Sequence, residues 1–515
     1  FSQWKIDQAG EGVLGFITNH SYLDNPTFRG MRQSLMNSFD EIYILDLHGN
    51  SLKKEKAYDG SKDENVFDIQ QGVAVAFFIK HKKAKSKAIV HHEVYGLRET
   101  KYDWLNKHNI KNVKWNYLEP QTPFYFLIPR NEDHIKDYQS FTSIQEIFPI
   151  NVTGIVTARD KFVIDFDELV LKRRIEEFRS LLIDNSSLKN RYKLKDTRGW
   201  KFKETRKALA KDENWDNNFA KILYRPFDVR SIYYSEKMVD WGRQEVMRHM
   251  LEPNISFCFM RQVSTSESYT QVLVSEHIVD NRTFFSSKGI IQQAPLYLYP
   301  ETDKKDLFSE HETGEKKPNI KPELFAELKK NFKKEVTPEE IFYYIYAVLY
   351  SNTYRTKYAE FLKIDFPRVP FTKDYKLFIQ LGKLGQQLSD LHLLKPASPV
   401  GRSKDLDNPA KGGTKFQGEG NNKVEKPRFD GIATQHDNGK VWINKEQYFD
   451  GVKEEVWKYQ IGGYQVCEKW LKDRKERTLT LDEIKTYCKI VTSLSKTIEL
   501  QKEIDKYFEN VEKTV

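Results

Sequence analysis

This sequence of 515 residues is poor in several features that often reveal a function. Its three cysteines have neither the spacing of a metal site nor the density of a disulfide scaffold, which is typical of a reduced, intracellular protein. No apolar stretch approaches the roughly 20 residues that a membrane helix needs, and no signal peptide is visible. Walker loops, zinc-site spacings, serine elbows and His-Glu-x-x-His motifs are also absent. We therefore expect a cytoplasmic protein with no membrane partner and no metal site.

Charge and hydrophobicity indicate a globular chain with a real core. Hydrophobic residues make up 39% of the sequence and charged residues 30%. At about 150 residues per domain, the length predicts roughly three domains. Lys and Arg exceed Asp and Glu by 83 to 74, and the net charge of +9 permits a polyanionic partner without requiring one.

The first 96 residues predict part of an α/β domain. We expect a helix at residues 27–39 and short strands at residues 12–19, 41–49, 72–80 and 88–96. Strand, helix and strand at this spacing form a βαβ unit, which argues for a parallel sheet with helices on its faces.

One loop of this domain places an aromatic residue in a polar setting. Phe67 lies among polar residues just ahead of the apolar strand at residues 72–80. Open α/β sheets bind ligands at the carboxyl ends of their strands, and both residues 19–24 and the loop with Phe67 map to that rim. Phe67 either folds back as a plug for the end of the sheet or presents its flat face to a ligand.

The rest of the chain divides by composition. Residues 97–215 alternate short helices and strands and suggest a spacer or coupling region, and residues 216–395 are rich in β-formers. Gly, Pro, Asn and Lys dominate residues 396–430, which predicts a flexible linker or long loop. Residues 431–515 are mostly helical in pattern.

Cations interleaved with aromatic rings are candidate nucleic-acid contacts. Arg can fork onto guanine in a major groove, and Lys or Arg can fix phosphates. The candidates are Arg225, Arg230, Arg243, Arg248, Arg261 and Arg282 in the β-rich region, and Lys80, Lys82 and Lys83 in the basic run KHKKAKSK. A solvated hairpin turn explains this run about as well as phosphate contact does. His91 and His92 lie in an expected strand, which favours a structural or surface role.

The order of these segments resembles the second half of the catalytic domain of gamma-class adenine-N6 DNA methyltransferases. The resemblance rests on GVLGFITNHSYLDNPTFRGMRQSLMNSFDEIYILDLHGN followed by ENVFDIQQGVAVAFFIK. Four later stretches look like the C-terminal part of type ISP or type IIG single-chain restriction-modification enzymes. They are NVTGIVTARDKFVID, KILYRPFDVRSIYY, FLKIDFPRVPF and EEVWKYQIGGYQVCEKWL.

The resemblance implies a fold. Residues 1–96 would be the second half of a Rossmann-like methyltransferase sheet, followed by an α+β spacer (97–215), a DNA target-recognition domain (216–395) and a helical C-terminus. In the family, the aromatic just ahead of the buried strand, here Phe67, stacks on an adenine that is flipped out of the duplex. Asn19, Ser21 and Tyr22 would form the target-base side of the same pocket.

Two motifs of the family are absent from these 515 residues. They are the Gly-rich loop that holds S-adenosylmethionine and the Asn-Pro-Pro-Tyr tetrad that hydrogen-bonds and stacks on the adenine. Because the sequence opens on Phe1 rather than Met, we expect a piece of a longer polypeptide. Its upstream part would carry both motifs, along with any translocase or nuclease domain, and this piece alone should not methylate.

These inferences favour an S-adenosylmethionine-dependent adenine-N6 methyltransferase that acts on double-stranded DNA at specific sites, in a restriction-modification system. The alternative is a non-catalytic DNA-specificity module that works with a separate methyltransferase subunit. A third hypothesis, a structural interaction protein, predicts no salt-dependent binding to DNA.

Overall fold

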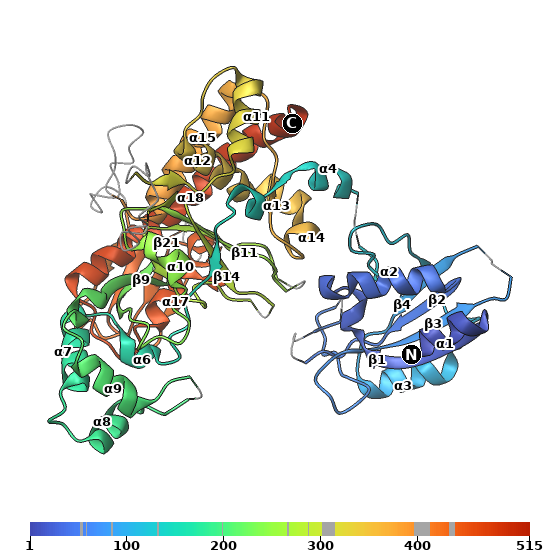
Figure 1. Ribbon diagram of the computed structural model, residues 1–515, viewed down its shortest axis with the longest axis horizontal. Helices are drawn as coiled ribbons and strands as arrows, with labels where there is room; N and C mark the ends of the chain where they lie inside the picture. The colour runs from blue at the N-terminus through green and yellow to red at the C-terminus, as the bar shows by residue number, and fades with distance from the viewer. Residues whose placement is uncertain are drawn as a thin grey trace, which may run out of the picture. The chain divides into compact units, whose positions relative to one another are not determined.

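The computed structural model describes residues 1–51, 55–57, 59–83, 86–130, 133–197, 199–264, 267–286, 288–300, 315–395, 413–431 and 438–515 (Figure 1). This part of the chain forms two compact units. Unit 1 comprises Phe1–Ile135 and, among the described residues further along the chain, Ser264; unit 2 comprises Lys136–Val263 and Glu267–Val515. No helix among the described residues combines the length and the apolarity that crossing a membrane requires.

Unit 1 is built on a sheet of five strands: β1 (Gly12–Asn19), β2 (Glu41–Asp46), β3 (Val73–Lys80), β4 (Ala88–Glu93) and β5 (Asn116–Tyr117). The order across the sheet is β1-β3-β2-β4-β5. β3 runs antiparallel to both of its neighbours, β1 and β2, whereas β2 and β4 run parallel. β5 pairs antiparallel with β4.

The expectation of a parallel sheet is therefore wrong for β3. β1 and β2 are parallel to each other and joined through helix α2 (Arg29–Ser38), as the βαβ pattern predicts, but β3 lies between them. The described residues that join β2 to β3 contain no helix. A parallel return ordinarily uses a helical crossover, so without one the chain returns antiparallel. The mixed α/β character is confirmed, and the Rossmann-like assignment stays a prediction.

Helices cover both faces of this sheet (Figure 1). On one face, Leu35 of α2 and the following Phe39 pack on Ile42 and Ile44 of β2. On the other face, Leu45 belongs to a small core that helix α3 (Arg98–Lys107) covers with its tryptophan and leucine. The remaining helical segments of unit 1 are α1 (Ser2–Ala9), η1 (His20–Leu23) and η2 (Pro26–Phe28).

Unit 2 contains several small sheets. Its strands are β6 (Thr142–Ser143), β7 (Val152–Thr153), β8 (Ile164–Asp165), β9 (Phe219–Arg225), β10 (Asp228–Tyr233), β11 (Ser256–Met260), β12 (Val272–Ser275), β13 (Ile278–Val279), β14 (Ile291–Pro295), β15 (Tyr297–Leu298), β16 (Lys317–Pro318), β17 (Arg368–Val369), β18 (Lys415–Gln417), β19 (Arg428–Asp430), β20 (Asn438–Trp442), β21 (Tyr448–Lys453), β22 (Gln460–Ile461) and β23 (Tyr464–Gln465). The four-stranded sheets have the orders β13-β9-β10-β8, β12-β11-β14-β7 and β18-β21-β20-β19. Two-stranded pairs join β15 to β16, β17 to β6 and β22 to β23.

Helices of very different lengths complete unit 2. They are α4 (Ile135–Ser140), which begins at the last residue of unit 1, α5 (Ile144–Ile147), α6 (Asp160–Val163), α7 (Glu168–Arg179), α8 (Asn185–Tyr192), α9 (Phe202–Ala210), η3 (Trp215–Asn218), α10 (Gln244–Met247), η4 (Arg248–Met250), α11 (Pro322–Phe332), α12 (Pro338–Tyr350), α13 (Asn352–Lys357), α14 (Ala359–Leu362), α15 (Tyr375–His392), α16 (Glu454–Trp457), α17 (Val466–Lys472) and α18 (Leu481–Lys513).

Helices α12, α15 and α18 lie side by side and form the helical part of unit 2 (Figure 1). α12 begins at a capping box of Thr337 and Glu340, and nine of its 13 residues are buried because the helix is apolar on nearly all sides after its acidic first turn. Gly385 of α15 lies so close to the carbonyl oxygen of Tyr343 that no Cβ would fit. The helical C-terminus that the sequence predicts is confirmed.

The expected linker at residues 396–430 is only partly described. Residues 396–412 lie outside the described part of the chain. Within residues 413–430, the chain contributes β18 and β19 to a four-stranded sheet. The boundaries predicted for the other regions stay predictions.

Candidate nucleic-acid interface

Two loops of unit 1 meet at one edge of the sheet: the loop after β1 and the long connection from β2 to β3. In the strand register, Asn19 at the end of β1 pairs with Val73 at the start of β3. Asp46, at the end of β2, pairs with the next residue of β3. The loop that follows β1 and both ends of the β2–β3 connection therefore lie on the same rim, as the sequence predicts.

Two neighbouring apolar residues of the β2–β3 connection have opposite environments. Val66 is 3% exposed and packs in the small core with Leu45, Leu47 and Val73. Phe67 is 45% exposed. Val66 therefore fills the end of the sheet, and the ring of Phe67 faces solvent at the rim.

Side-chain hydrogen bonds hold the backbone of this loop in place. The buried Asn65 amide donates to the carbonyl oxygens of Gly49 (3.2 Å) and Gln71 (2.6 Å), and its oxygen accepts from the Phe67 amide (2.9 Å). Arg98 donates to the carbonyl oxygens of Asn65 (2.8 Å) and Phe67 (3.1 Å). The position of Phe67 is thus fixed by contacts that leave its ring uncovered.

A fully buried ion pair lies beneath the loop. Lys101 Nζ is 2.7 Å from Asp63 Oδ1, and neither side chain is exposed. Lys101 also donates to the carbonyl oxygens of Leu47 (2.7 Å) and Glu64 (2.6 Å). The other carboxylate oxygen of Asp63 accepts from the amide of Gly49 (2.6 Å). Buried charges of this kind are stable only when they are paired and hydrogen-bonded.

A cluster of histidines and carboxylates joins the loops after β1 and β2. His20 Nδ1 is 3.0 Å from Asp46 Oδ1, and His48 Nε2 is 3.2 Å from Glu93 Oε2. Burial alone would raise the pKa of Asp46, but the bonds and charges of His20 and His48 outweigh it and lower the pKa. Burial alone would lower the pKa of His48, but Glu93, Asp46 and Glu55 outweigh it and raise the pKa.

His20, His48 and Glu55 offer one ligand atom each within 4.8 Å of one another, a spacing that a metal ion could use. The sequence predicts no metal site, and this group was missed because its members are not at a fixed spacing in the chain. In the structure, the ring nitrogens of His20 and His48 that face Asp46 and Glu93 already have carboxylate partners. The visible role of the cluster is to bind the rim loops to each other.

The residues predicted for the target-base pocket differ in exposure. Asn19 is exposed, and its side-chain oxygen accepts from the Ser21 amide (2.7 Å), which starts η1. Tyr22 is buried, and its hydroxyl has no hydrogen-bond partner among the described residues. Burial and the charge of Asp46 raise the pKa of Tyr22. The structure thus brings Asn19 and Ser21 to the rim with Phe67, and turns Tyr22 inward; their roles stay predictions.

The basic run lies at the opposite end of the sheet from Phe67. Lys80 closes β3, pairs in register with Gly12 and forms an ion pair with Asp7 (2.6 Å). Lys82 and Lys83 are exposed, and the two residues after them lie outside the described part. This run and the Phe67 rim are separate features of unit 1.

Two of the predicted DNA-binding arginines have partners within unit 2. Arg225 is mostly buried, 2.8 Å from Asp280, and stacks on the ring of Tyr224. Arg230 forms an ion pair with the buried Asp228 (2.6 Å), which also pairs with Arg474 (2.9 Å). These contacts connect strands β9 and β10 to the rest of unit 2, a role that the sequence analysis did not foresee.

Among the other predicted arginines, Arg261 and Arg282 are exposed, whereas Arg243 and Arg248 are partly buried. Arg261 is half exposed and pairs with Asp365 (2.8 Å). Arg248 donates to the carbonyl oxygen of Tyr299 (3.0 Å). Arg243 lies beside the exposed ring of Trp241, and the exposed Arg282 has no ion pair among the described residues. Cations that lack an internal counter-ion are the ones that can bind a polyanion at least cost.

Several residues of the rim were missed from the sequence, above all His20, Asp46, His48 and Glu93. A usable signal was present, because all four are polar residues at or just beyond the ends of strands β1, β2 and β4. Polar side chains that end apolar strands mark the ligand edge of an α/β sheet.

The comparisons with known proteins point to one family. The model of the type ISP C-terminal specificity domain matches residues 146–503. No curated protein matches the chain. Similar solved structures include a cryo-EM structure of a DrdV–DNA complex, the ATP-dependent type ISP restriction-modification enzyme LlaBIII bound to DNA, and a nuclease-deletion mutant of the type ISP enzyme LlaGI in complex with a DNA substrate mimic.

These three structures are similar in fold and distant in sequence. The DrdV complex is 22% identical with a TM-score of 0.70, and the match covers 97% of this chain and 51% of that chain. LlaBIII is 23% identical with a TM-score of 0.69, and the match covers 98% of this chain and 33% of that chain. LlaGI is 20% identical with a TM-score of 0.64, and the match covers 96% of this chain and 39% of that chain. The chain therefore corresponds to only part of each of these proteins.

Proposed function

The chain belongs to the family of type ISP C-terminal specificity domains, and on that premise we propose that it reads the DNA target of a restriction-modification enzyme. The observation that carries the proposal is the family match over residues 146–503, which includes the whole β-rich region with the candidate arginines. The partly buried Arg243 beside the exposed Trp241, together with the exposed Arg282, supports it, because arginine and aromatic side chains at a surface suit base and phosphate contacts.

We further propose that unit 1 is one half of an adenine-N6 methyltransferase domain. Phe67 supports this, because an exposed ring on a rigidly held loop at the ligand edge of the sheet suits a base that has left the duplex. Base–aromatic stacking contributes about 1–3 kcal/mol, which offsets part of the cost of flipping. S-adenosylmethionine would be held by the upstream part, because the 515 residues contain neither the Gly-rich loop nor the Asn-Pro-Pro-Tyr tetrad.

The exposed apolar residues of the edge strand β1 support the proposal that an upstream half of the same polypeptide packs beside it. β1 ends the sheet order of unit 1, and its Val13, Phe16 and Ile17 are 65%, 56% and 52% exposed. An apolar edge strand is a site for pairing with another strand and, left open, promotes aggregation. A strand from the upstream half beside β1 would complete the sheet.

Methyl transfer by the longer polypeptide tests the proposed activity. The upstream coding sequence is determined, and the full polypeptide is incubated with duplex DNA and S-adenosylmethionine labelled in its methyl group. The proposal predicts both missing motifs upstream and N6-methyladenine in the product. A polypeptide that lacks both motifs and binds a specific sequence without methyl transfer would be the non-catalytic specificity module instead.

Titration of this chain with duplex DNA tests whether Arg243 and Arg282 recognise the target sequence. We expect substitution of Arg243 or Arg282 by Gln to weaken binding, and a base-contacting arginine to cost about 1–3 kcal/mol of discrimination between the target and a scrambled duplex. The matched control is Arg191→Gln, which removes an exposed arginine that pairs with Glu177 (2.7 Å). Specificity unchanged in both test variants would remove Arg243 and Arg282 from the reading surface.

A further inference from the structure

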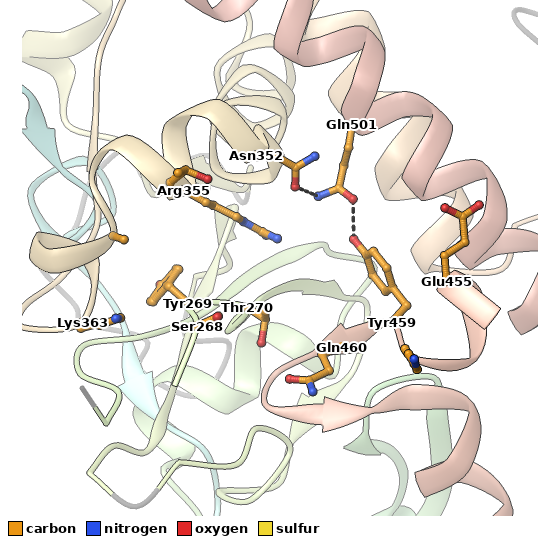
Figure 2. A pocket seen from close by; sticks show the side chains of 13 residues that line it. Ser268, Tyr269, Thr270, Asn352, Arg355, Lys363, Glu455, Tyr459, Gln460 and Gln501 are labelled. Carbon is orange, nitrogen blue, oxygen red and sulfur yellow. Dashed lines mark hydrogen bonds between the residues drawn. The ribbon is translucent and has the colours of Figure 1, made fainter. Parts of the chain in front are cut away.

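Unit 2 contains a cavity of about 610 Å³ between α13, α14, the β22–β23 pair and the long helix α18 (Figure 2). Tyr269 and Gln501 form its buried wall, and the exposed Asn352, Lys458 and Gln460 lie at its mouth. All of the lining residues except Ala359 carry a polar or charged group, so an occupant with polar groups would find hydrogen-bond partners there.

One wall is fixed by a chain of hydrogen bonds. Gln501 donates to the side chain of Asn352 (3.2 Å), and its oxygen accepts from the hydroxyl of Tyr459 (2.8 Å) (Figure 2). Gln501 also donates to the carbonyl oxygen of Tyr350 (2.9 Å). These bonds connect α18 to the ends of α12 and α13 and to the segment after α16. The wall is therefore preorganised for a ligand, which lowers the entropy cost of binding.

Arg355 of α13 is the unusual member of the lining. Its guanidinium stacks over the ring of Tyr350 at 4.4 Å, its Nε donates to the carbonyl oxygen of Leu349 (2.6 Å), and its NH2 is buried with no hydrogen-bond partner among the described residues. No carboxylate in this part of the chain pairs with it. A partly buried cation is costly unless an anion or hydrogen-bond acceptors compensate it.

The charges around Arg355 also favour an anion. Lys363 and Lys458 line the same cavity, and their partners Glu360 (3.5 Å) and Glu454 (2.5 Å) are residues of their own helices outside the lining. Glu455 is the carboxylate of the lining and lies at the exposed mouth. Because these glutamates offset the charges of the two lysines, Arg355 is the cation of the lining that has no carboxylate partner among the described residues.

We propose that this cavity binds a phosphate group, with Arg355 as its main ligand and Lys363 and Lys458 as supporting charges. Arg presents a planar fork of donors that matches phosphate oxygens, and the hydroxyls of Ser268 and Thr270 on the opposite side add neutral donors. The source of the phosphate is the backbone of the bound DNA, a step that rests on the proposed function. The cavity would thus fix the position of the duplex rather than read its bases.

Salt titrations of DNA binding by the full chain test this proposal. Each phosphate contact contributes about 0.9 to the slope of log affinity against log salt. We expect Arg355→Gln to lower that slope by about 0.9 and to weaken target and scrambled duplexes equally. Lys458→Gln should lower it by a smaller amount, and circular dichroism checks that both variants are folded.

The matched control for Lys458→Gln is Lys472→Gln, which removes a lysine with the same kind of i,i+4 glutamate partner outside the cavity (2.9 Å). It should leave the slope unchanged. A folded Arg355→Gln chain with the wild-type slope and affinity would overturn the proposal. If the wild-type chain itself binds no duplex, the proposed function fails instead.

Calorimetric titration with inorganic phosphate separates the two sources of the ligand. Weak phosphate binding that Arg355→Gln abolishes, together with the lower DNA slope, supports the proposal. Phosphate binding that depends on Arg355 while DNA binding does not would overturn the DNA source and assign the cavity to a free phosphate compound.

Discussion

Lys101 and Asp63 hold the Phe67 loop through an ion pair that has no contact with solvent. Replacing Lys101 by Met would leave the Asp63 carboxylate buried without its cation, and breaking such a pair costs about 3–5 kcal/mol. We expect Lys101→Met to lower the free energy of local opening by that amount, measured by hydrogen exchange of the amides in residues 63–73.

Lys62→Met is the matched control for this loop. It removes the pair of Lys62 with Glu64, in which the lysine is 74% exposed, and exposed pairs contribute about 0–1 kcal/mol. Its exchange protection should stay close to that of the wild type. Equal protection in both variants would contradict the role assigned to the buried pair.

The exposed ring of Phe67 leads to a prediction about flipping. In the longer polypeptide, Phe67→Ala should slow methyl transfer and leave duplex affinity nearly unchanged, because the stack forms only after the base has left the helix. Fluorescence of 2-aminopurine at the target position reports the extrusion and should fall in the variant. A folded variant that methylates and flips at the wild-type rate would show that Phe67 is not part of the base pocket.

We expect the stability of unit 1 to depend on pH through the protonation of His48. Its pKa is raised in the folded chain, because the hydrogen bond to Glu93 and the charges of Asp46 and Glu55 outweigh burial. The folded state therefore binds this proton more tightly than the unfolded state, whose histidine pKa is about 6.5. The stability that this proton contributes is fully present below that value and is lost as the pH rises through the folded pKa.

Thermal unfolding at several pH values measures this effect. The difference in stability between the wild type and His48→Gln should shrink as the pH rises through the raised pKa of His48. Asp46 acts in the opposite sense, because its lowered pKa makes its contribution disappear as the pH falls. A difference that stays constant as the pH rises above about 6.5 would contradict the raised pKa of His48.

For individual residues, the sequence does not predict which side chains are buried or which ion pairs they form. Phe67 and Val66 are adjacent and apolar, and only the fold decides that Val66 faces the core. Arg225 and Arg230 look like surface cations in the sequence, but Asp280 and Arg474, far along the chain, turn them into parts of internal ion pairs. Such contacts depend on tertiary structure, which local patterns do not contain.

At the scale of elements, the first strands of unit 1 were predictable because apolar runs are local. The expected strand at residues 12–19 is β1, and the expected helix at residues 27–39 contains α2. The strand order was not predictable in the same way. The position of β3 between β1 and β2 depends on pairing between residues about 30 to 70 positions apart, and a run of apolar residues does not specify its neighbour.

The edge strand β1 gives an element-scale prediction. If a strand of the upstream half pairs with β1, amides of Gly12–Asn19 that face away from β3 should exchange more slowly in the longer polypeptide than in this chain. β5, at the other edge of the sheet, provides the internal control and should exchange equally in both. Equal exchange of β1 in the two proteins would contradict the proposed completion of the sheet.

At the scale of the whole molecule, the two units correspond to two proposed tasks. In unit 1, the exposed ring of Phe67 lies on a hydrogen-bonded loop at the rim of the α/β sheet. Unit 2 contains nearly all of the region that matches the specificity family. Sequence motifs were sufficient to identify both regions. It did not identify the phosphate cavity, because Arg355, Lys458 and Gln501 come from distant segments that meet only in the folded chain.

Selection from a pool of duplexes with a randomised segment tests the central claim, that this chain recognises a specific DNA sequence. The bound fraction is sequenced, and the affinity of the enriched duplex is compared with that of a scrambled one at fixed salt. The account predicts a shared motif in the enriched pool and an affinity for it at least about 10³-fold above the scrambled duplex, the lower end for specific DNA-binding proteins. Binding without a shared motif, or with equal affinity for both duplexes, would contradict it.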